Sequence, residues 1–503
     1  MATLFVQALT RYGDRTAIVD GKARHSYWDL SVRVGRLLTL FDRLGWPPGT
    51  TVALGIPMGF DFLSWYIACQ IGGITVLDLP PQLVPEVLRH IVEASGADHV
   101  IVQAATANPA ALENLQALPV RVSVLGTLAP YPELAPLVAQ CEPAPLDVRP
   151  APACAAISTS SGSTGKPKAL AFTGEALASL TLLHLATLDY PRDPVTVTYR
   201  TSFATMGVSV VPTLLRGGVV ATLTALDTQA IAATAAAVGA NLLYLTPDTL
   251  YALADDPGFA AAARKLRLVL YSGQLAPAKL PELREKFGPV FVNLYGCSEA
   301  NPAVVQLPEE HDYTGRGRGS AVGRGLLGVE VRIQDEAGQR LPAGQVGEIV
   351  IKSPARMTAY VGQPERTAET IRDGWVRTGD IGWITEDDFI YIVDRLAFAV
   401  ASRGRQVYPG QIDAILRDHP AVRACTCVGL EDAGLGHRIC AAVVLSAAGA
   451  ATAHQLAEFV RARDPNLPID DVVFVPELPR SPLTHKVDRV RLKRLLTGPP
   501  VEA

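Results

Sequence analysis

Residues Ser160 to Lys168 read SSGSTGKPK and follow the short apolar run Ala153–Ile157. Glycines let a loop turn successive backbone N–H groups into one concavity, which is how a polypeptide grips phosphate oxygens. The serine and threonine hydroxyls add neutral donors, and Lys166 or Lys168 can supply positive charge. The residue types of this stretch therefore predict a loop that binds a polyphosphate.

This stretch is not a Walker A loop, because that motif has four residues between its glycines and a hydroxyl residue after its lysine. Here two residues separate Gly162 from Gly165, and Pro167 follows Lys166. Proline favours an extended backbone, and the apolar residues 169–172 continue beyond it, so we expect strand–loop–strand rather than strand–loop–helix. A serine- and glycine-rich surface turn is the structural alternative to a phosphate loop.

The length of 503 residues predicts two or three domains, and 49% hydrophobic with 19% charged residues indicates globular rather than disordered chain. A net charge of −4 gives no reason to expect nucleic acid or an anionic membrane as a partner. No apolar run reaches the roughly 18 residues that span a bilayer, and no signal peptide is evident. Seven scattered cysteines fit neither a disulfide framework nor a zinc site, so a reducing cytoplasm is expected.

Residues 1–150 alternate helical patterns with short apolar strands. Thr51–Pro57, a helix over Phe60–Ile71, Gly72–Leu79 and a helix from Val84 predict βαβ-like units, hence a mostly parallel sheet covered by helices. Proline and alanine dominate residues 140–155, which are expected to form a linker. Residues 319–367 alternate in a β pattern between glycine-containing turns and predict a small β-rich subdomain.

The loop at 160–168 resembles the phosphate loop of the adenylate-forming superfamily, which includes acyl-CoA synthetases, aryl-CoA ligases, luciferases and the adenylation domains of peptide synthetases. Other stretches resemble further motifs of that superfamily in the same order, across the whole chain: LVLYSGQLAP (268–277), NLYGCSE (293–299), WVRTGDIG (375–382), DRLA (394–397), SRGRQVYPGQID (402–413) and LPRSPLTHKVDR (478–489). The resemblance implies an α/β fold. A large N-terminal domain of stacked α/β sheets with a β-rich subdomain (1–394) would precede a small mobile α+β C-terminal domain (395–503). The hinge would lie near 395–397.

The resemblance also implies a nucleotide site with its metal. Glu299 would hold Mg2+ against the ATP phosphates, Tyr295 would stack on adenine and Asp380 would accept hydrogen bonds from the ribose hydroxyls. Arg395 would contact ribose and phosphate, and Lys486 would be the catalytic lysine together with Glu299 and Arg395. The implied nucleotide-binding residues are Ser160, Ser161, Gly162, Ser163, Thr164, Lys168, Gly273, Gln274, Leu275, Asn293, Tyr295, Gly296, Ser298, Asp380, Arg395 and Lys486, with Thr164 joining Glu299 as a metal ligand.

Residues Thr201–Val211 occupy the place of the superfamily's acyl-pocket helix, and an ordinary buried helix is the alternative. Small residues around Gly207 would leave room for a bulky acyl group, and no charge is evident there to pair an amino group. The expected substrate is therefore an apolar or aromatic acid. Arg403 and Gly404 resemble the loop that lines the pantetheine tunnel and would bind CoA. The expected acyl pocket comprises Ala204, Met206, Gly207, Gly273 and Gly296.

The chain departs from the superfamily pattern at Ala397, Gln411 and His485, where Asp or Lys, Glu and Gly are usual. Ala204 replaces a frequent histidine, and Asp78 stands at a usually apolar or small position. The first three departures fall in the mobile domain that switches between half-reactions. They leave open whether both half-reactions are catalysed, and they motivate the alternative of thioester formation from a supplied acyl-adenylate.

The function implied is an acyl-CoA synthetase that uses ATP, Mg2+ and CoA to convert a carboxylic acid through acyl-AMP into a thioester. Two alternatives keep the fold: thioester formation from a supplied acyl-adenylate, or loading of a separate carrier protein. A third is a non-catalytic adenylate binder, against which the presence of Lys486, Asp380, Arg395 and Glu299 speaks. Only nine of the 503 residues are lysines, so a lysine at the motif position of Lys486 is not expected by chance and argues for retained chemistry. Monomer and homodimer are both compatible with the sequence.

Overall fold

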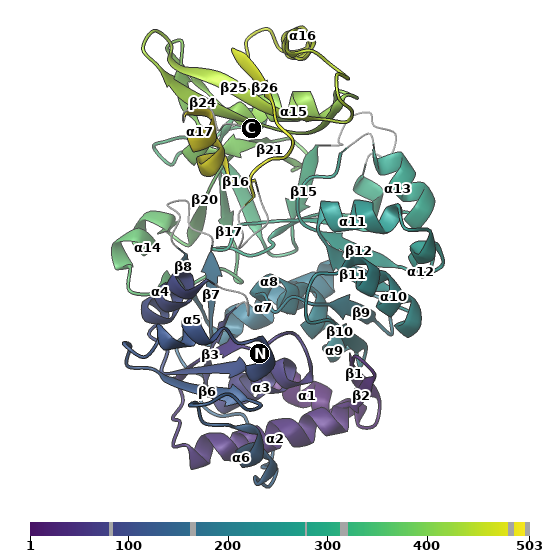
Figure 1. Cartoon of the computed structure of the whole chain (residues 1–503), viewed down its shortest axis with the longest axis vertical. Coiled ribbons are helices and arrows are strands. Elements are labelled where there is room, and N and C mark those ends of the chain that lie inside the picture. The colour runs from purple at the N-terminus through teal and green to yellow at the C-terminus, as the bar shows by residue number, and fades with distance from the viewer. Residues whose placement is uncertain (80–83, 161–166, 277–278, 312–319, 481–486, 498–503) are drawn as a thin grey trace.

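The computed structural model describes residues 1–79, 84–160, 167–276, 279–311, 320–480 and 487–497. These residues form sheets of fourteen, seven, three and two strands, with helices covering the sheets. Figure 1 shows helices α1–α3 at one end of the long axis and the C-terminal elements at the other, beside β20 and β21. In the described residues, no helix combines the length and apolar character needed to cross a bilayer.

The seven-stranded sheet has the order β18-β8-β7-β4-β3-β5-β6. Strands β7, β4, β3, β5 and β6 run parallel, which confirms the parallel sheet predicted for the N-terminal part. The strands are β3 (Thr51–Gly55), β4 (Thr75–Asp78), β5 (His99–Gln103), β6 (Arg121–Leu125), β7 (Ala156–Ser160), β8 (Lys168–Phe172) and β18 (Ala359–Tyr360). The helices of this part are α1 (Ala2–Tyr12), α2 (Tyr27–Arg43), α3 (Phe60–Gly72), α4 (Pro85–Ser95), α5 (Pro109–Glu113), α6 (Ala135–Ala139) and α7 (Gly174–Thr187).

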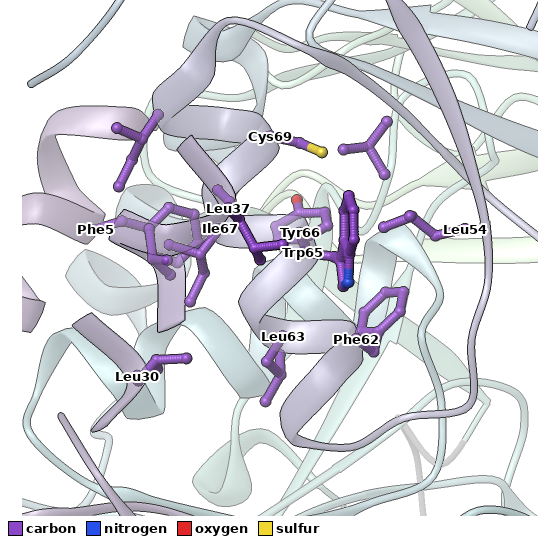
Figure 2. Packing of buried hydrophobic residues seen from close by; sticks show 14 of the residues in the cluster. Phe5, Leu30, Leu37, Leu54, Phe62, Leu63, Trp65, Tyr66, Ile67 and Cys69 are labelled. Carbon is purple, nitrogen blue, oxygen red and sulfur yellow. The ribbon is translucent and has the colours of Figure 1, made fainter. Parts of the chain in front are cut away.

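Helix α3 is apolar on every side and is buried on every side, as such a composition requires. Figure 2 shows its side chains, among them Trp65 and Phe62, surrounded by Leu37 of α2, Leu54 of β3 and Phe5 of α1. Trp65 is fully buried, and truncating a core side chain of that size costs about 3–5 kcal/mol. This core holds the seven-stranded sheet against the first three helices.

The fourteen-stranded sheet joins a parallel α/β half to an antiparallel half through β13 and β14. The predicted β-rich subdomain is present, but its strands continue the large sheet instead of forming a detached one. The parallel half contains β1 (Thr16–Asp20), β9 (Val195–Thr198), β10 (Val219–Thr222), β11 (Leu242–Leu245), β12 (Leu268–Tyr271) and β13 (Phe291–Tyr295), with β2 (Ala23–Ser26) at its edge. The antiparallel half contains β14 (Val304–Gln306), β15 (Ala321–Gly325), β16 (Glu330–Gln334), β17 (Gly347–Lys352), β19 (Ile371–Arg372), β20 (Trp375–Ile384) and β21 (Ile390–Arg395). The helices are α8 (Phe203–Thr205), η2 (Met206–Val210), α9 (Val211–Leu215), α10 (Thr228–Val238), α11 (Pro247–Ala254), α12 (Ala260–Ala263), α13 (Leu280–Phe287) and α14 (Pro364–Thr370).

The chain after Arg395 forms its own small sheets and its own apolar clusters, which draw only on residues from Val400 onward. Strand β25 lies between antiparallel β24 and parallel β26, and β22 pairs with β23. The elements are η6 (Leu396–Phe398), β22 (Val400–Ser402), β23 (Arg405–Val407), α15 (Pro409–Arg417), β24 (Val422–Asp432), β25 (Gly436–Leu445), α16 (Ala453–Arg463), β26 (Asp471–Phe474) and α17 (Arg489–Thr497).

The segment expected to form the acyl-pocket helix is not one regular helix, because η2 is a π-helical turn between α8 and α9. Pro212 has no N–H to offer the carbonyl of Val208, and the Tyr190 hydroxyl donates to that carbonyl over 2.6 Å instead. The room expected at Gly207 is absent, because a Cβ there would lie 2.2 Å from Leu180 of α7. Gly207 therefore permits close helix packing, and this expectation from the sequence was wrong.

Candidate nucleotide site

The base of the predicted phosphate loop is a strand–loop–strand unit, as predicted. Strands β7 and β8 are antiparallel, and Ser160 pairs with Lys168 at their open end. The Ser160 hydroxyl is buried and has no hydrogen-bond partner in the described part of the chain. Lys168 Nζ lies 5.0 Å from the centre of the Tyr360 ring. Ser161, Gly162, Ser163 and Thr164 lie outside the described residues.

Glu299 is held at this edge by Tyr360 of β18. The Tyr360 hydroxyl donates to Glu299 Oε1 over 2.5 Å. Burial and the neighbouring Glu299 both raise the pKa of Tyr360, so its hydroxyl stays protonated and keeps donating. Burial lowers the pKa of Lys168, and the charge of Glu299 offsets part of that effect. Cation, carboxylate and phenol therefore lie together beside the end of β7.

Tyr295, Asp380 and Arg395 come from three strands and meet in one cluster, as expected from the sequence. The Tyr295 hydroxyl donates to Asp380 Oδ2 over 2.8 Å, and Arg395 Nε donates to Asp380 Oδ1 over 3.0 Å. Asp380 and Arg395 are direct cross-strand partners in β20 and β21. Burial and the charge of Asp380 raise the pKa of Tyr295, which keeps its hydroxyl a donor. An ionised carboxylate can only accept hydrogen bonds, so Asp380 has the chemistry that sugar hydroxyl donors require.

A small pocket opens between strands β12–β15 and the start of α13. Its lining residues are Tyr271, Gln274, Leu275, Leu280, Asn293, Gln306, His311 and Ala321. Oδ1 of Asn293 is buried and finds no partner among the described residues. His311 lies between the Tyr271 hydroxyl, 2.9 Å from Nε2, and the Leu307 carbonyl, 2.8 Å from Nδ1. Burial lowers the pKa of His311, so a neutral ring with its proton on Nδ1 satisfies both contacts.

Glycines shape the two turns that border this pocket. Gly273 has φ +124°, a conformation that favours glycine, and is exposed at the end of β12. A Cβ on Gly296 would lie 2.0 Å from the Asn301 carbonyl oxygen, so only glycine fits there. Ser298 is exposed in the following turn.

The residues expected to form the acyl pocket are only partly brought together. Met206 is 1% exposed and belongs to the core cluster of Figure 2, and Gly207 is covered by Leu180. Neither residue lines open space, which corrects the expectation for both. Ala204 and Gly296 are half-buried and Gly273 is exposed, so these three positions have accessible surface.

The loop expected to bind CoA is the two-residue turn of the β22–β23 hairpin. Arg403 and Gly404 have φ of +54° and +71°, which matches a turn with two left-handed residues. Arg403 Nη2 donates to Asp470 Oδ1 over 2.5 Å, which anchors the turn to the small sheet. No atom lies within 4 Å of a Cβ built on Gly404, so the turn faces open space.

The segment joining the two parts is fixed by a buried carboxylate. Asp394 accepts hydrogen bonds from the Gly410 N–H over 2.6 Å and from Arg489 over 2.8 Å. Arg489 also donates to Asp413 over 2.5 Å, and both carboxylates are almost fully buried. Lys486 and His485 lie outside the described residues.

Family models match most of the chain: residues 5–361 match the model described as AMP-binding enzyme, and residues 411–483 match the AMP-binding enzyme C-terminal domain. The chain belongs to the AMP-binding enzyme family. It is 33% identical to a feruloyl-CoA synthase from Amycolatopsis sp. over 438 residues, which is 86% of each chain. This relationship confirms the family resemblance found in the sequence.

Two solved structures related to this AMP-binding enzyme extend the comparison to the fold. The amide bond synthetase McbA from Marinactinospora thermotolerans superposes with a TM-score of 0.90 at 27% identity, covering 99% of this chain and 100% of that one. ATP-bound MatB from Rhodopseudomonas palustris gives a TM-score of 0.87 at 26% identity, covering 98% of each chain. Both support the predicted fold class, a large N-terminal domain followed by a small C-terminal domain.

A nucleotide with a bound Mg2+, which the AMP-binding enzyme family implies, fits the residues present. Ser160 Oγ and Asn293 Oδ1 are buried polar atoms that lack hydrogen-bond partners in the described chain. Buried polar atoms are normally hydrogen-bonded, so a bound nucleotide would supply partners for both. No group of three or more His, Cys, Asp or Glu in the described residues could hold a metal ion. The Glu299 carboxylate is a hard oxygen ligand of the kind that Mg2+ prefers, and Mg2+ is commonly bound through one or two carboxylates together with phosphate oxygens.

Three residues of this AMP-binding enzyme's site were missed from the sequence: Tyr360, His311 and Arg417. Tyr360 lies within residues 319–367, for which the sequence predicted only a small β-rich subdomain. Arg417 of α15 donates to Gln274 Oε1 over 2.9 Å and so connects the small domain to the pocket. The available signal was weak, because an isolated tyrosine, histidine or arginine far from its partner has no local pattern.

Proposed function

We propose that this AMP-binding enzyme is an AMP-forming acid–thiol ligase that activates a carboxylic acid with ATP and transfers the acyl group to CoA. The observation that carries the proposal is the cluster of Tyr295, Asp380 and Arg395 beside Lys168 and Glu299. It offers a carboxylate for ribose, cations for phosphate and a carboxylate for Mg2+ in one place.

In the proposed first step, a carboxylate oxygen of the acid attacks the α-phosphorus of ATP and pyrophosphate leaves. All reacting groups are anions, so positioning and charge neutralisation matter most. Lys168 and Arg395 would bind phosphate oxygens, Asp380 would fix the ribose, and Lys486 would contact the acid and the α-phosphate. Mg2+ on Glu299 would neutralise charge on the departing pyrophosphate. In the second step the CoA sulfur bonds to the acyl carbon, its proton passes to solvent, and AMP leaves.

We also propose that the domain boundary lies at 394/395 and that the small domain turns there between the two steps. Strand β21 ends at Arg395, and the apolar clusters of the small domain begin at Val400. The Arg403–Gly404 turn would then enter the CoA tunnel, and Lys486 would withdraw. Such alternation lets one site serve two reactions.

A second candidate is transfer of the same activated acyl group to an amine. It rests on the similarity, over almost the full length of both chains, to the amide bond synthetase McbA. The adenylation step and its residues would be unchanged, and only the acceptor would differ. A carrier-protein thiol is a further acceptor for the same intermediate.

Pyrophosphate release over a panel of aliphatic and aromatic acids tests the first step, with Lys486→Ala and Asp380→Asn as site variants. Arg461→Ala, on the exposed face of α16, is the matched control. We expect acid-dependent release that falls roughly a hundred- to a thousandfold in Lys486→Ala and is unchanged in the control. Product analysis with CoA, amines or carrier protein then identifies the acceptor. Absence of release with every acid would refute adenylation, and amide without thioester would favour the second candidate.

A further inference from the structure

Arg200 follows β9 and is held by its immediate neighbours rather than by an acid. Its Nε donates to the Tyr199 hydroxyl over 3.0 Å, and its backbone N–H donates to Thr198 Oγ1 over 3.2 Å. Its guanidinium carbon lies 5.3 Å from the centre of the Tyr199 ring. No carboxylate of the described residues forms an ion pair with it, and the residue is half-buried. A guanidinium in that position has both Nη groups available to a ligand.

Tyr244 and Ser272 lie near the carboxyl ends of two neighbouring strands, β11 and β12, of the fourteen-stranded sheet. Strands β9, β11 and β12 are neighbouring parallel strands, so the segments after Thr198 and Tyr271 emerge together with the end of β11. Burial raises the pKa of Tyr244, while the charge of Arg200 and a hydrogen bond with Ser272 act in the opposite direction. The phenol, the hydroxyl and the guanidinium thus share one polar environment.

This polar environment adjoins the positions that retain accessible surface for an acyl group. Ser272 precedes Gly273, and both are exposed at the carboxyl end of β12. Ala204 lies in α8, four residues after Arg200, and is half-buried. Ligands of α/β sheets bind beyond the carboxyl ends of parallel strands, which is where these side chains lie.

We propose that Arg200, with Tyr244, forms the far end of the acyl site and selects carboxylic acids that carry a second anionic or acceptor group. This inference rests on the proposed adenylation function and names its substrate class. It replaces the sequence-based expectation of a wholly apolar or aromatic acid.

The chemistry of the two side chains supports this class over an aliphatic chain. Arg200 is a fixed donor fork that matches the two oxygens of a carboxylate or sulfonate, and Tyr244 adds a hydroxyl. An acid ending in a methyl group would displace water from the guanidinium and return no hydrogen bond, which is unfavourable. Sites built to bond a polar group reject the analogue that lacks it more strongly than apolar pockets distinguish chain length.

The test compares matched acids in pyrophosphate release: 4-carboxybenzoate and 4-sulfobenzoate against 4-methylbenzoate, and glutarate against pentanoate. The proteins are wild type, Arg200→Gln, Arg200→Lys, Tyr244→Phe and the control Arg192→Gln, an exposed arginine before β9. We expect kcat/KM in the wild type to favour the doubly polar acid of at least one pair by roughly ten- to hundredfold. Arg200→Gln should abolish that preference mainly through KM, and Arg200→Lys should restore part of it. The control and the activity toward the methyl-ended acids should change less than about threefold.

Each outcome is decisive. Release from methyl-ended acids with equal or greater efficiency would overturn the substrate class while leaving the proposed function intact. An equal loss for both members of a pair in Arg200→Gln would make Arg200 a structural residue that orders Tyr199. No release from any acid by the wild type would overturn the adenylation proposal itself, and this inference with it.

Discussion

In the proposed function Glu299 holds Mg2+, and the hydrogen bond from Tyr360 would make that binding depend on a residue outside the motifs quoted from the sequence. Tyr360→Phe removes the hydroxyl, 2.5 Å from Glu299 Oε1, and keeps the ring under Lys168 Nζ. A hydrogen bond to a charged acceptor contributes about 1.5–3 kcal/mol, which corresponds to roughly ten- to hundredfold in the population of the aligned carboxylate. We therefore expect the Mg2+ concentration for half-maximal pyrophosphate release to rise about tenfold or more. Because Mg2+ can realign Glu299, kcat at saturating Mg2+ should fall less than about threefold.

The measurement is a Mg2+ titration at fixed acid and saturating ATP. Tyr131→Phe is the control and should titrate as the wild type does; this half-buried tyrosine lies two residues before the bridge to β6, at the edge of the seven-stranded sheet opposite β18. Tyr360→Ala also removes the ring beside Lys168 and should lower kcat further. The reasoning would be refuted if Tyr360→Phe lowered the rate of pyrophosphate release equally at every Mg2+ concentration, with the same half-maximal concentration as the wild type. Tyr360 would then be a packing residue.

Three other predictions follow from single features of the fold. Burial raises the pKa of Asp78 to about 6, against roughly 3.9 in an unfolded chain, so its ionisation destabilises the fold as pH rises between those values. Asp78→Asn should therefore raise the free energy of unfolding by about 2–3 kcal/mol above pH 7 and by progressively less toward pH 4. Urea titrations of both proteins across that pH range measure this. A constant difference in unfolding free energy at every pH would contradict it. In Gly296→Ala the new Cβ meets the Asn301 carbonyl, and such overpacking costs about 1–3 kcal/mol of folding free energy. The melting temperature and the affinity for ATP should therefore both fall. A variant with wild-type values of both would exclude that clash. Arg417→Ala removes the contact to Gln274 and also the 3.8 Å ion pair with the buried Asp413, which keeps Arg489 as a partner at 2.5 Å. The free energy of unfolding should therefore fall by roughly 1 kcal/mol, and the ratio of thioester to adenylate formation should shift; an unchanged ratio would deny the Gln274 contact a role in domain movement.

Local chemistry explains what the sequence predicted well. Pro167 and the flanking apolar residues determine their own backbone, so the strand–loop–strand unit over β7 and β8 was predictable from nine residues. The cluster of Tyr295, Asp380 and Arg395 was predictable because each residue lies within a short motif that carries its own family signature. Glu299 and Lys168 were predictable for the same reason, because each lies within a short motif that resembles the family.

Non-local contacts explain what the sequence did not predict. A glycine in a helix indicates either open space or close packing, and only the position of Leu180 decides that Gly207 packs closely. Tyr360 meets Glu299 because β18 adds to β8, a pairing between strands almost two hundred residues apart. Arg200 bonds locally only to Tyr199 and Thr198, so its relation to Tyr244 of β11 appears only when the neighbouring strands are aligned.

The strengths of the contacts on the two sides of the small domain favour the proposed rotation. At the pivot, Asp394 and Asp413 share Arg489 in a nearly buried cluster, and breaking such a cluster is costly because a charge is left buried and unpaired. At two other contacts with the large domain, Arg417 donates to Gln274, and Arg480 pairs with Asp248 over 3.2 Å through largely exposed side chains. Exposed contacts of this kind contribute about 0–1 kcal/mol each, so they can exchange with water at little cost. The small domain is therefore attached firmly beside the proposed boundary at 394/395 and weakly at Arg417 and Arg480, a distribution that would suit the rotation proposed above.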